Sequence, residues 1–272
     1  MNNSAMPRSD RHTVLAPATD LCMSLPAQAW EPAADTSAQQ MLEDARQDVI
    51  DGRLAQAAEK HLWFHEHVLE RDPAMSGVRL SFALFDWAEL ARRYPPALQQ
   101  LHSVRERALA RVDAGGRTGQ TALRELISLN TALQDPASTR DGFERLAHRD
   151  PALAERHTLD ALPALIALND VALASKHLQV EPALRSTEEL YRSMKASMPR
   201  LPADSLAEAL RAQQRYVELQ LARVAYVLVK DGRDAEAQQV LTRGRALLGP
   251  EASVHHLNEA MRGIAPPDDF AR

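Results

Sequence analysis

The chain has 272 residues, a formal net charge of −5, and charged side chains of both signs interspersed at 25% of its positions. This balance excludes the concentrated basic surface of a nucleic-acid-binding protein, so we expect no nucleic-acid partner. The single cysteine, Cys22, excludes an internal disulfide and cysteine-rich zinc modules, and no apolar run reaches the roughly 18 residues of a membrane span.

Residues 1–36 are rich in Pro, Ala, Ser, Thr and Asn and show no sustained hydrophobic period. This composition predicts a flexible N-terminal tail. The segment has no uninterrupted apolar core before a small-residue cleavage site, which argues against a secretory signal. Asp20 also interrupts the apolar stretch that a lipoprotein cysteine at position 22 would need. We therefore expect a cytoplasmic protein with no membrane partner.

From residue 37 onward Ala and Leu dominate, and Gly and Pro fall at intervals typical of helix ends. No alternating strand pattern is present, and the short loops predict antiparallel hairpins. The fold class is therefore all-α, with a helical domain over 37–265 and a C-terminal tail over 266–272. The predicted helices cover about 37–50, 54–71, 77–93, 96–114, 119–134, 138–149, 152–179 (with a break near Pro163 or Asn169), 183–197, 204–231, 234–248 and 251–262.

Two short sequences recur along the chain. The heptapeptide DGRLAQA at 51–57 returns as DGRDAEA at 231–237, and ERDPAM at 70–75 is echoed by HRDPAL at 148–153. In the first pair, the glycine closes one helix in a left-handed conformation, and the last alanine lets the next helix approach its neighbour closely. A separation of 180 residues corresponds to five units of about 36, which predicts stacked helical hairpins.

Gly52, Ala57 and Asp72-Pro73 together resemble the pattern of tetratricopeptide repeats, and 204–248 shows similar features. Two departures are the spacing from Ala57 to Pro73, about one helical turn longer than in that family, and His61 at the family's aromatic position. The segment 61–98 is also similar to bacterial proteins grouped with such repeats. The resemblance implies an α-α superhelix and a non-enzymatic adaptor or scaffold, without a cofactor, that binds a protein or peptide.

The predicted helix 54–71 carries three histidines. A helical wheel places His61 and His65 at the centre of the apolar stripe, one turn apart, while Trp63 and His67 point away. The i, i+4 pair has the spacing of zinc-binding helices, but no glutamate follows His61 and no third ligand sits at a recognisable distance. We interpret the pair as buried interhelical histidines. The alternative is a metal-dependent enzyme or regulator that uses this pair and a carboxylate such as Glu66 or Glu89.

Other candidate motifs do not predict chemistry. His255 and His256 are adjacent, so we expect them to diverge on a helix and to form a solvated surface. The glycine-rich stretch 113–123 lacks the Lys-Ser/Thr pair of a phosphate loop and is predicted to link two helices. No serine lies in a nucleophile elbow, and Cys22 falls in the tail, so no residue is predicted to be catalytic.

Half of the chain's twelve aromatic residues lie between positions 63 and 94. On the predicted helix 77–93, Leu84 and Trp87 mark a core face, whereas Phe82 and Phe85 lie off it among charges of both signs. Such a stripe is typical of a protein-recognition surface, although packing between repeats is an alternative. The predicted groove surrounds the second to fourth helices, and its partner-binding residues are Trp63, His67, Arg79, Phe82, Phe85, Asp86, Glu89 and Arg93.

The predicted helix 204–231 has a continuous apolar stripe that favours capping of the helical array. A contact between two copies of this helix in a homodimer is the alternative, which would make the chain a structural homo-oligomer. The stripe consists of Leu206, Leu210, Val217, Leu221, Val224 and Leu228.

Overall fold

The computed structural model describes residue 1, residues 30–197 and residues 203–267, and the regular structure in this part of the chain is entirely helical. The prediction of an all-α protein is therefore confirmed. Within the same residues, no helix is long and apolar enough to cross a membrane. The helices are α1 (Ala38–Ile50), α2 (Leu54–Arg71), α3 (Ser76–Arg79), α4 (Phe82–Ala91), α5 (Pro95–Ala114), α6 (Gly116–Ala132), α7 (Pro136–Arg149), α8 (Pro151–Ala167), α9 (Val171–His177), α10 (Val180–Ser197), α11 (Ala203–Lys230), α12 (Asp234–Leu248) and α13 (His255–Ala260), with a short 3₁₀ turn at Pro73–Met75.

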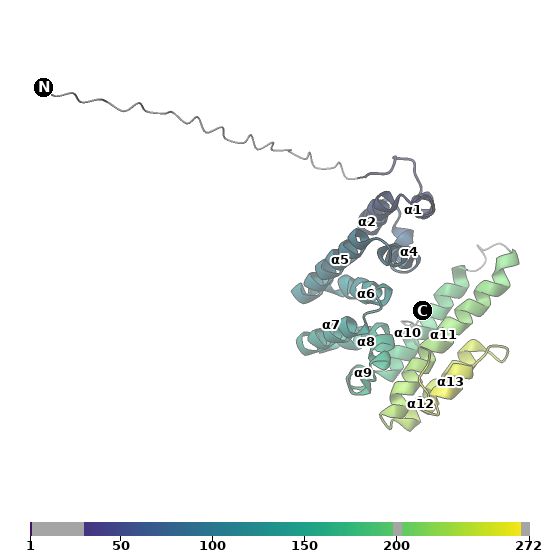
Figure 1. Ribbon diagram of the computed structural model, residues 1–272. Helices are drawn as coiled ribbons and strands as arrows, with labels where there is room; N and C mark the ends of the chain where they lie inside the picture. Colours follow the sequence, from purple (N-terminus) through teal and green to yellow (C-terminus); the bar gives the residue numbers. More distant parts are fainter. Residues whose placement is uncertain (2–29, 198–202, 268–272) are drawn as a thin grey trace.

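The helices follow one another along an arc (Figure 1). Helices α1 and α2, α5 and α6, and α7 and α8 pack as neighbours, and α9 ends this first arm. Helices α10 to α13 form a second arm, in which the long helix α11 contacts α8 and α9 as well as α10, α12 and α13. Helix α11 thus joins the two arms of the molecule.

One turn geometry recurs at four helix ends. Gly52, Gln134, Asn169 and Gly232 all have a positive φ, between 55° and 78°. In each turn the next residue donates its backbone N–H to the carbonyl five residues earlier, at 2.8 Å. Glycine adopts this left-handed conformation without steric strain, so the two Asp-Gly-Arg sequences predict the turns in which they lie. The expected helix break near Asn169 is confirmed, whereas α8 continues through its internal proline.

Aspartates cap the N-termini of α7, α8 and α9. The side chains of Asp135, Asp150 and Asp170 accept the N–H of the third residue onward, at 3.0, 3.0 and 3.2 Å. N–H groups in the first turn lack the carbonyl four residues earlier that serves the helix interior, so the carboxylates help to satisfy them. Proline occupies the first turn of α7 and α8, where its missing N–H is not needed.

The prediction of one helix over 77–93 is wrong. Helix α3 ends at Arg79, and α4 begins at Phe82 after a non-helical Ser81 (φ −132°, ψ −98°). The side chain of Arg79 turns inward and contacts Glu125 on α6. A wheel drawn across this break therefore places Arg79 on the wrong face relative to Phe82, because the break changes the angular register.

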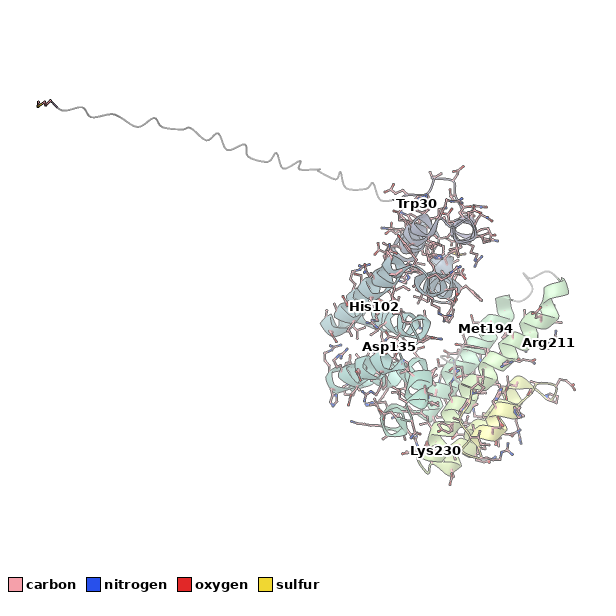
Figure 2. The ribbon with its side chains drawn as sticks, viewed as in Figure 1. Trp30, His102, Asp135, Met194, Arg211 and Lys230 are labelled. Carbon is pink, nitrogen blue, oxygen red and sulfur yellow. The ribbon has the colours of Figure 1, made fainter. Side chains whose placement is uncertain are left out.

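Part of the expected N-terminal tail packs on the helical array. The rings of Trp30 and Trp63 meet edge to face, with centroids 6.1 Å apart, and Figure 2 shows Trp30 where the described chain enters the helical array. Pro32 is buried, and Arg71 donates to the backbone carbonyl of Ala33 at 3.2 Å. Residues 30–36 thus cover one end of α2. The rest of that expected tail, 2–29, lies outside the described residues, as does 268–272 of the C-terminal tail.

The second half of α11 is interior. Val217, Leu221, Val224 and Leu228 are each at most 2% exposed. These four residues belong to the stripe that we considered for a homodimer contact, and they pack within the chain instead. Of the remaining stripe residues, Leu206 is 40% exposed. Only the first half of the helix therefore offers apolar surface to a second copy.

Candidate functional site

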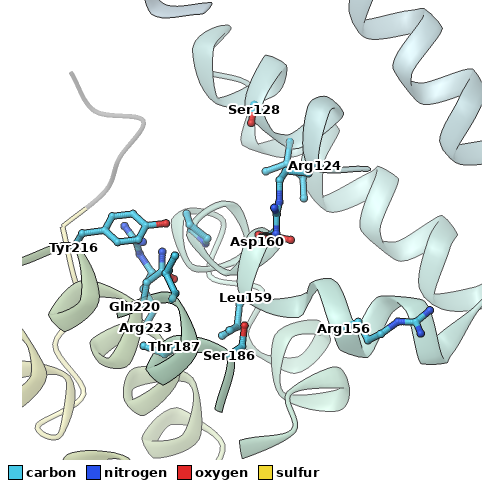
Figure 3. A pocket seen from close by; sticks show the side chains of 13 residues that line it. Arg124, Ser128, Arg156, Leu159, Asp160, Ser186, Thr187, Tyr216, Gln220 and Arg223 are labelled. Atoms are coloured by element: carbon cyan, nitrogen blue, oxygen red, sulfur yellow. Dashed lines mark ion pairs between the residues drawn. The ribbon is translucent and has the colours of Figure 1, made fainter. Parts of the chain in front are cut away.

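A cavity of about 440 Å³ lies between four helices, α6, α8, α10 and α11 (Figure 3). It lies between the two arms of the molecule, and we call it the interhelical pocket. No sequence motif predicts this pocket, because its lining residues come from four separate segments between Arg124 and Arg223. The lining residues are Arg124, Ile127, Ser128, Arg156, Leu159, Asp160, Pro163, Ser186, Thr187, Leu190, Tyr216, Gln220 and Arg223.

The interhelical pocket carries an excess of positive charge. Three arginines line it, and Asp160 is the only acidic residue among the lining side chains. The Asp160 carboxylate is itself engaged, because Arg124 lies 3.7 Å away and His157 Nδ1 lies 2.9 Å away. Arg156 is an exposed residue of the pocket lining. The pocket therefore favours an anionic group.

Neutral hydrogen-bonding side chains complete the interhelical pocket. Figure 3 shows Tyr216 reaching from α11 toward the helices that carry Arg124 and Asp160, with Gln220 on the same helix. Tyr216 is 46% exposed. Hydroxyl and amide groups beside arginines suit a peptide segment, which offers backbone N–H and C=O groups as well as side-chain carboxylates.

The two phenylalanines of the predicted recognition stripe lie on the exposed face of α4. Phe82 and Phe85 are 69% and 51% exposed, whereas Trp87 and Leu84 are each 1% exposed. The expectation that the two phenylalanines lie off the core face is confirmed, and the alternative that they pack between repeats is wrong. Whether they bind a partner stays a prediction.

The two acidic neighbours of this stripe are each paired with an arginine. Asp86 forms an ion pair with Arg46 of α1 at 2.9 Å, and Glu89 pairs with Arg92 at 2.8 Å. Arg93 is exposed at the end of α4. The open surface of α4 is thus apolar at Phe82 and Phe85 and ionic around them, the composition of an interface rim.

Three of the predicted partner-binding residues lie elsewhere. Trp63 is half-buried, because Trp30 and the guanidinium of Arg71, 4.8 Å from its ring centroid, cover it. His67 lies beside Trp63, and its Nδ1 is 3.3 Å from a carboxylate oxygen of Glu70. Arg79 is inside the molecule. The structure therefore does not place these three with the α4 stripe.

Arg79 belongs to a buried ionic cluster that we call the Glu125 cluster. Glu125 Oε1 lies 3.0 Å from His65 Nε2, 3.0 Å from Arg79 Nη2 and 3.1 Å from Arg111 Nη2. Burial alone would raise the pKa of Glu125, but the hydrogen bond to His65 and the two arginine charges lower it to about 2. The cluster joins α2, α3, α5 and α6.

The two interior histidines of α2 are buried, as predicted. His61 and His65 are 2% and 3% exposed, and both rings contact Trp87, at centroid distances of 6.4 and 5.9 Å. Arg79 Nη2 lies 3.1 Å from His65 Nε2, so a guanidinium faces the nitrogen that a metal ion would need. This charge disfavours the alternative of a metal site at His61 and His65.

The burial of His61 predicts a pH-dependent stability. Burial, with a smaller effect of the Arg46 charge, lowers the pKa of His61 to about 4. Between pH 6.5 and 4 the unfolded histidine is protonated and the folded one is not, so stability falls as the pH falls. We expect His61 to reduce the free energy of unfolding by about 3 kcal/mol between pH 7 and pH 4.

Urea unfolding at pH 7, 5.5 and 4 measures this effect. The His61→Gln variant, which stays neutral throughout, should lose less stability over the same range than the wild type. If the free energy of unfolding fell equally with pH in the two proteins, the assignment to His61 would be contradicted.

A different histidine pair lies beside a carboxylate. In the described part of the chain, the group whose potential ligand atoms fall within 4.8 Å of one another is His255, His256 and Glu259. The expectation that the two histidines diverge is therefore wrong. Glu259 is one turn further along α13, close to both ring nitrogens.

Comparison with protein-family models, curated proteins and solved structures finds no match to this chain.

Proposed function

We propose that this chain is a non-enzymatic adaptor that binds an acidic peptide segment of another protein in the interhelical pocket. We further propose that its helices form a superhelix of the tetratricopeptide type. The recurring left-handed turns at Gly52 and Gly232, and the burial of Ala57 and Ala237 one turn later, support this architecture. Helical-repeat proteins of this type bind their partners along an extended concave surface.

The observation that carries the proposal is the charge of the interhelical pocket. Three arginines line the cavity with one aspartate, which is already engaged by Arg124 and His157. A guanidinium binds a carboxylate through two parallel hydrogen bonds, and such contacts are stronger and more specific than neutral ones. Apolar lining residues such as Ile127 and Leu159 would contact the rest of the peptide.

The α4 stripe supplies a second contact surface in this proposal. Phe82 and Phe85 present large apolar side chains to solvent, and aromatic side chains dominate the energetics of protein interfaces. The ion pairs of Asp86 and Glu89 would form the rim of that contact. A partner longer than the pocket would bind both surfaces. Its overall affinity would then exceed the affinity of either contact alone.

A paired peptide library tests the proposal. One library of fluorescent peptides carries Glu or Asp at fixed positions, and the matched library carries Gln or Asn there. We expect fluorescence anisotropy to show binding of acidic members only, and about tenfold or greater weakening in Arg124→Gln. Affinity should also fall as salt increases.

Arg192→Gln is the matched control, since Arg192 is exposed on α10 and does not line the pocket. It should bind acidic peptides as the wild type does. Equal binding of the two libraries, or an unchanged affinity in Arg124→Gln, would contradict the proposal. The Phe82→Ala/Phe85→Ala variant should keep short-peptide binding, since these residues lie on α4 outside the pocket lining.

A further inference from the structure

Helix α13 presents three side chains with metal-binding atoms. His255 Nε2 lies 3.3 Å from Glu259 Oε2, and His256 Nδ1 lies 3.5 Å from the same oxygen. The helix itself produces this arrangement, because Glu259 follows the two histidines by four and three residues, and side chains at those spacings share a helix face.

These separations match a coordination shell. Zinc bonds of about 2.0–2.1 Å at tetrahedral angles place two ligand atoms about 3.4 Å apart. Both measured separations, 3.3 and 3.5 Å, are close to that value. The three ligand atoms together lie within 4.8 Å of one another, so a small rotation of the more exposed His255 ring would bring them around one ion.

His256 supplies a second observation that points to a ligand. Its Nδ1 is buried and makes no hydrogen bond. A buried polar atom without a partner costs about 1–3 kcal/mol, so natural proteins rarely leave one unsatisfied. A metal ion between His256 and Glu259 would provide the missing partner.

The backbone of this turn is fixed by buried neighbours. Glu218 on α11 is 2% exposed, and its carboxylate accepts the backbone N–H of His256 at 2.7 Å. Leu257 and Ala260 are both fully buried. The ligand side chains therefore project from a docked, hydrogen-bonded turn, which lowers the entropy lost when they bind an ion. The His255 side chain, 65% exposed, leaves one side of the site open to water.

We propose that His255, His256 and Glu259 bind a divalent transition-metal ion, with Zn²⁺ as the physiological candidate and water as the fourth ligand. Two imidazoles and one carboxylate are a donor set that zinc accepts. The site shares no residue with the interhelical pocket and does not depend on the proposed peptide binding. An ion that binds the folded chain and not the unfolded one would also raise the stability of the fold.

Calorimetric titration of the untagged, metal-free chain with Zn²⁺ tests the site. A Cys22→Ser background removes the thiol that would otherwise compete for the metal. We expect one ion per chain, tetrahedral absorption bands when Co²⁺ replaces Zn²⁺, and a higher melting temperature with metal. His256→Ala and Glu259→Gln should each weaken binding about tenfold or more.

His148→Ala is the matched control, because His148 is exposed on α7 and belongs to no ligand group among the described residues. It should bind Zn²⁺ as the background protein does. Absence of binding, or equal affinity in His256→Ala and the background protein, would overturn the proposal. Circular dichroism of each variant distinguishes loss of the site from loss of the fold.

Discussion

Trp87→Ala is expected to lower the free energy of unfolding by about 3–5 kcal/mol, because it removes a large side chain from a closed interior. Trp87 is 1% exposed, and its ring contacts both His61 and His65 of α2. The alanine variant would leave a cavity between α2 and α4 and would expose two buried histidines to water. Urea unfolding followed by circular dichroism measures the loss.

Phe82→Ala is the matched control on the same helix. Phe82 is 69% exposed, so its removal should change the free energy of unfolding by less than about 0.5 kcal/mol. The two substitutions both remove an aromatic ring from α4, at positions five residues apart. Similar losses in the two variants would contradict the division of α4 into a buried and an open face.

The ends of the helices could be predicted because they depend on local chemistry. Gly52 and Gly232 adopt conformations that other residues avoid, and Pro73 disfavours helix at the residue before it. The turn at Gln134 was harder to place exactly, since glutamine at a positive φ carries no such signal. The all-α class and the buried faces of α2 and α4 follow from the same local patterns.

The interior polar contacts could not be predicted, because they join residues far apart in the sequence. His65 and Arg79 meet Glu125 across 60 and 46 positions. The inward turn of Arg79 accompanies the break between α3 and α4, which no glycine or proline marks. The interhelical pocket is not predictable from the sequence for the same reason, since four helices have to be placed before Arg124 and Tyr216 line one cavity.

Glu125→Ala is expected to destabilise the protein by about 3–5 kcal/mol, because it leaves buried positive charge without its partner. Glu125 is 6% exposed and accepts contacts from His65, Arg79 and Arg111. Its pKa of about 2 means that the wild-type carboxylate is ionised at neutral pH. The stabilisation is present above the ordinary glutamate pKa and is lost as the pH falls toward 2.

A double-mutant cycle separates the ionic contact from simple packing. Glu125→Leu and Arg79→Met each break the pair alone, but Glu125→Leu/Arg79→Met replaces both groups with apolar ones and should recover about 1–3 kcal/mol relative to the sum of these two single losses. Glu66→Ala is the surface control, since Glu66 pairs with the exposed Arg107 and should cost less than about 1 kcal/mol. Strict additivity in the cycle would mean that Glu125 and Arg79 stabilise the fold independently, and that the cluster is not a coupled unit linking α3 to α6.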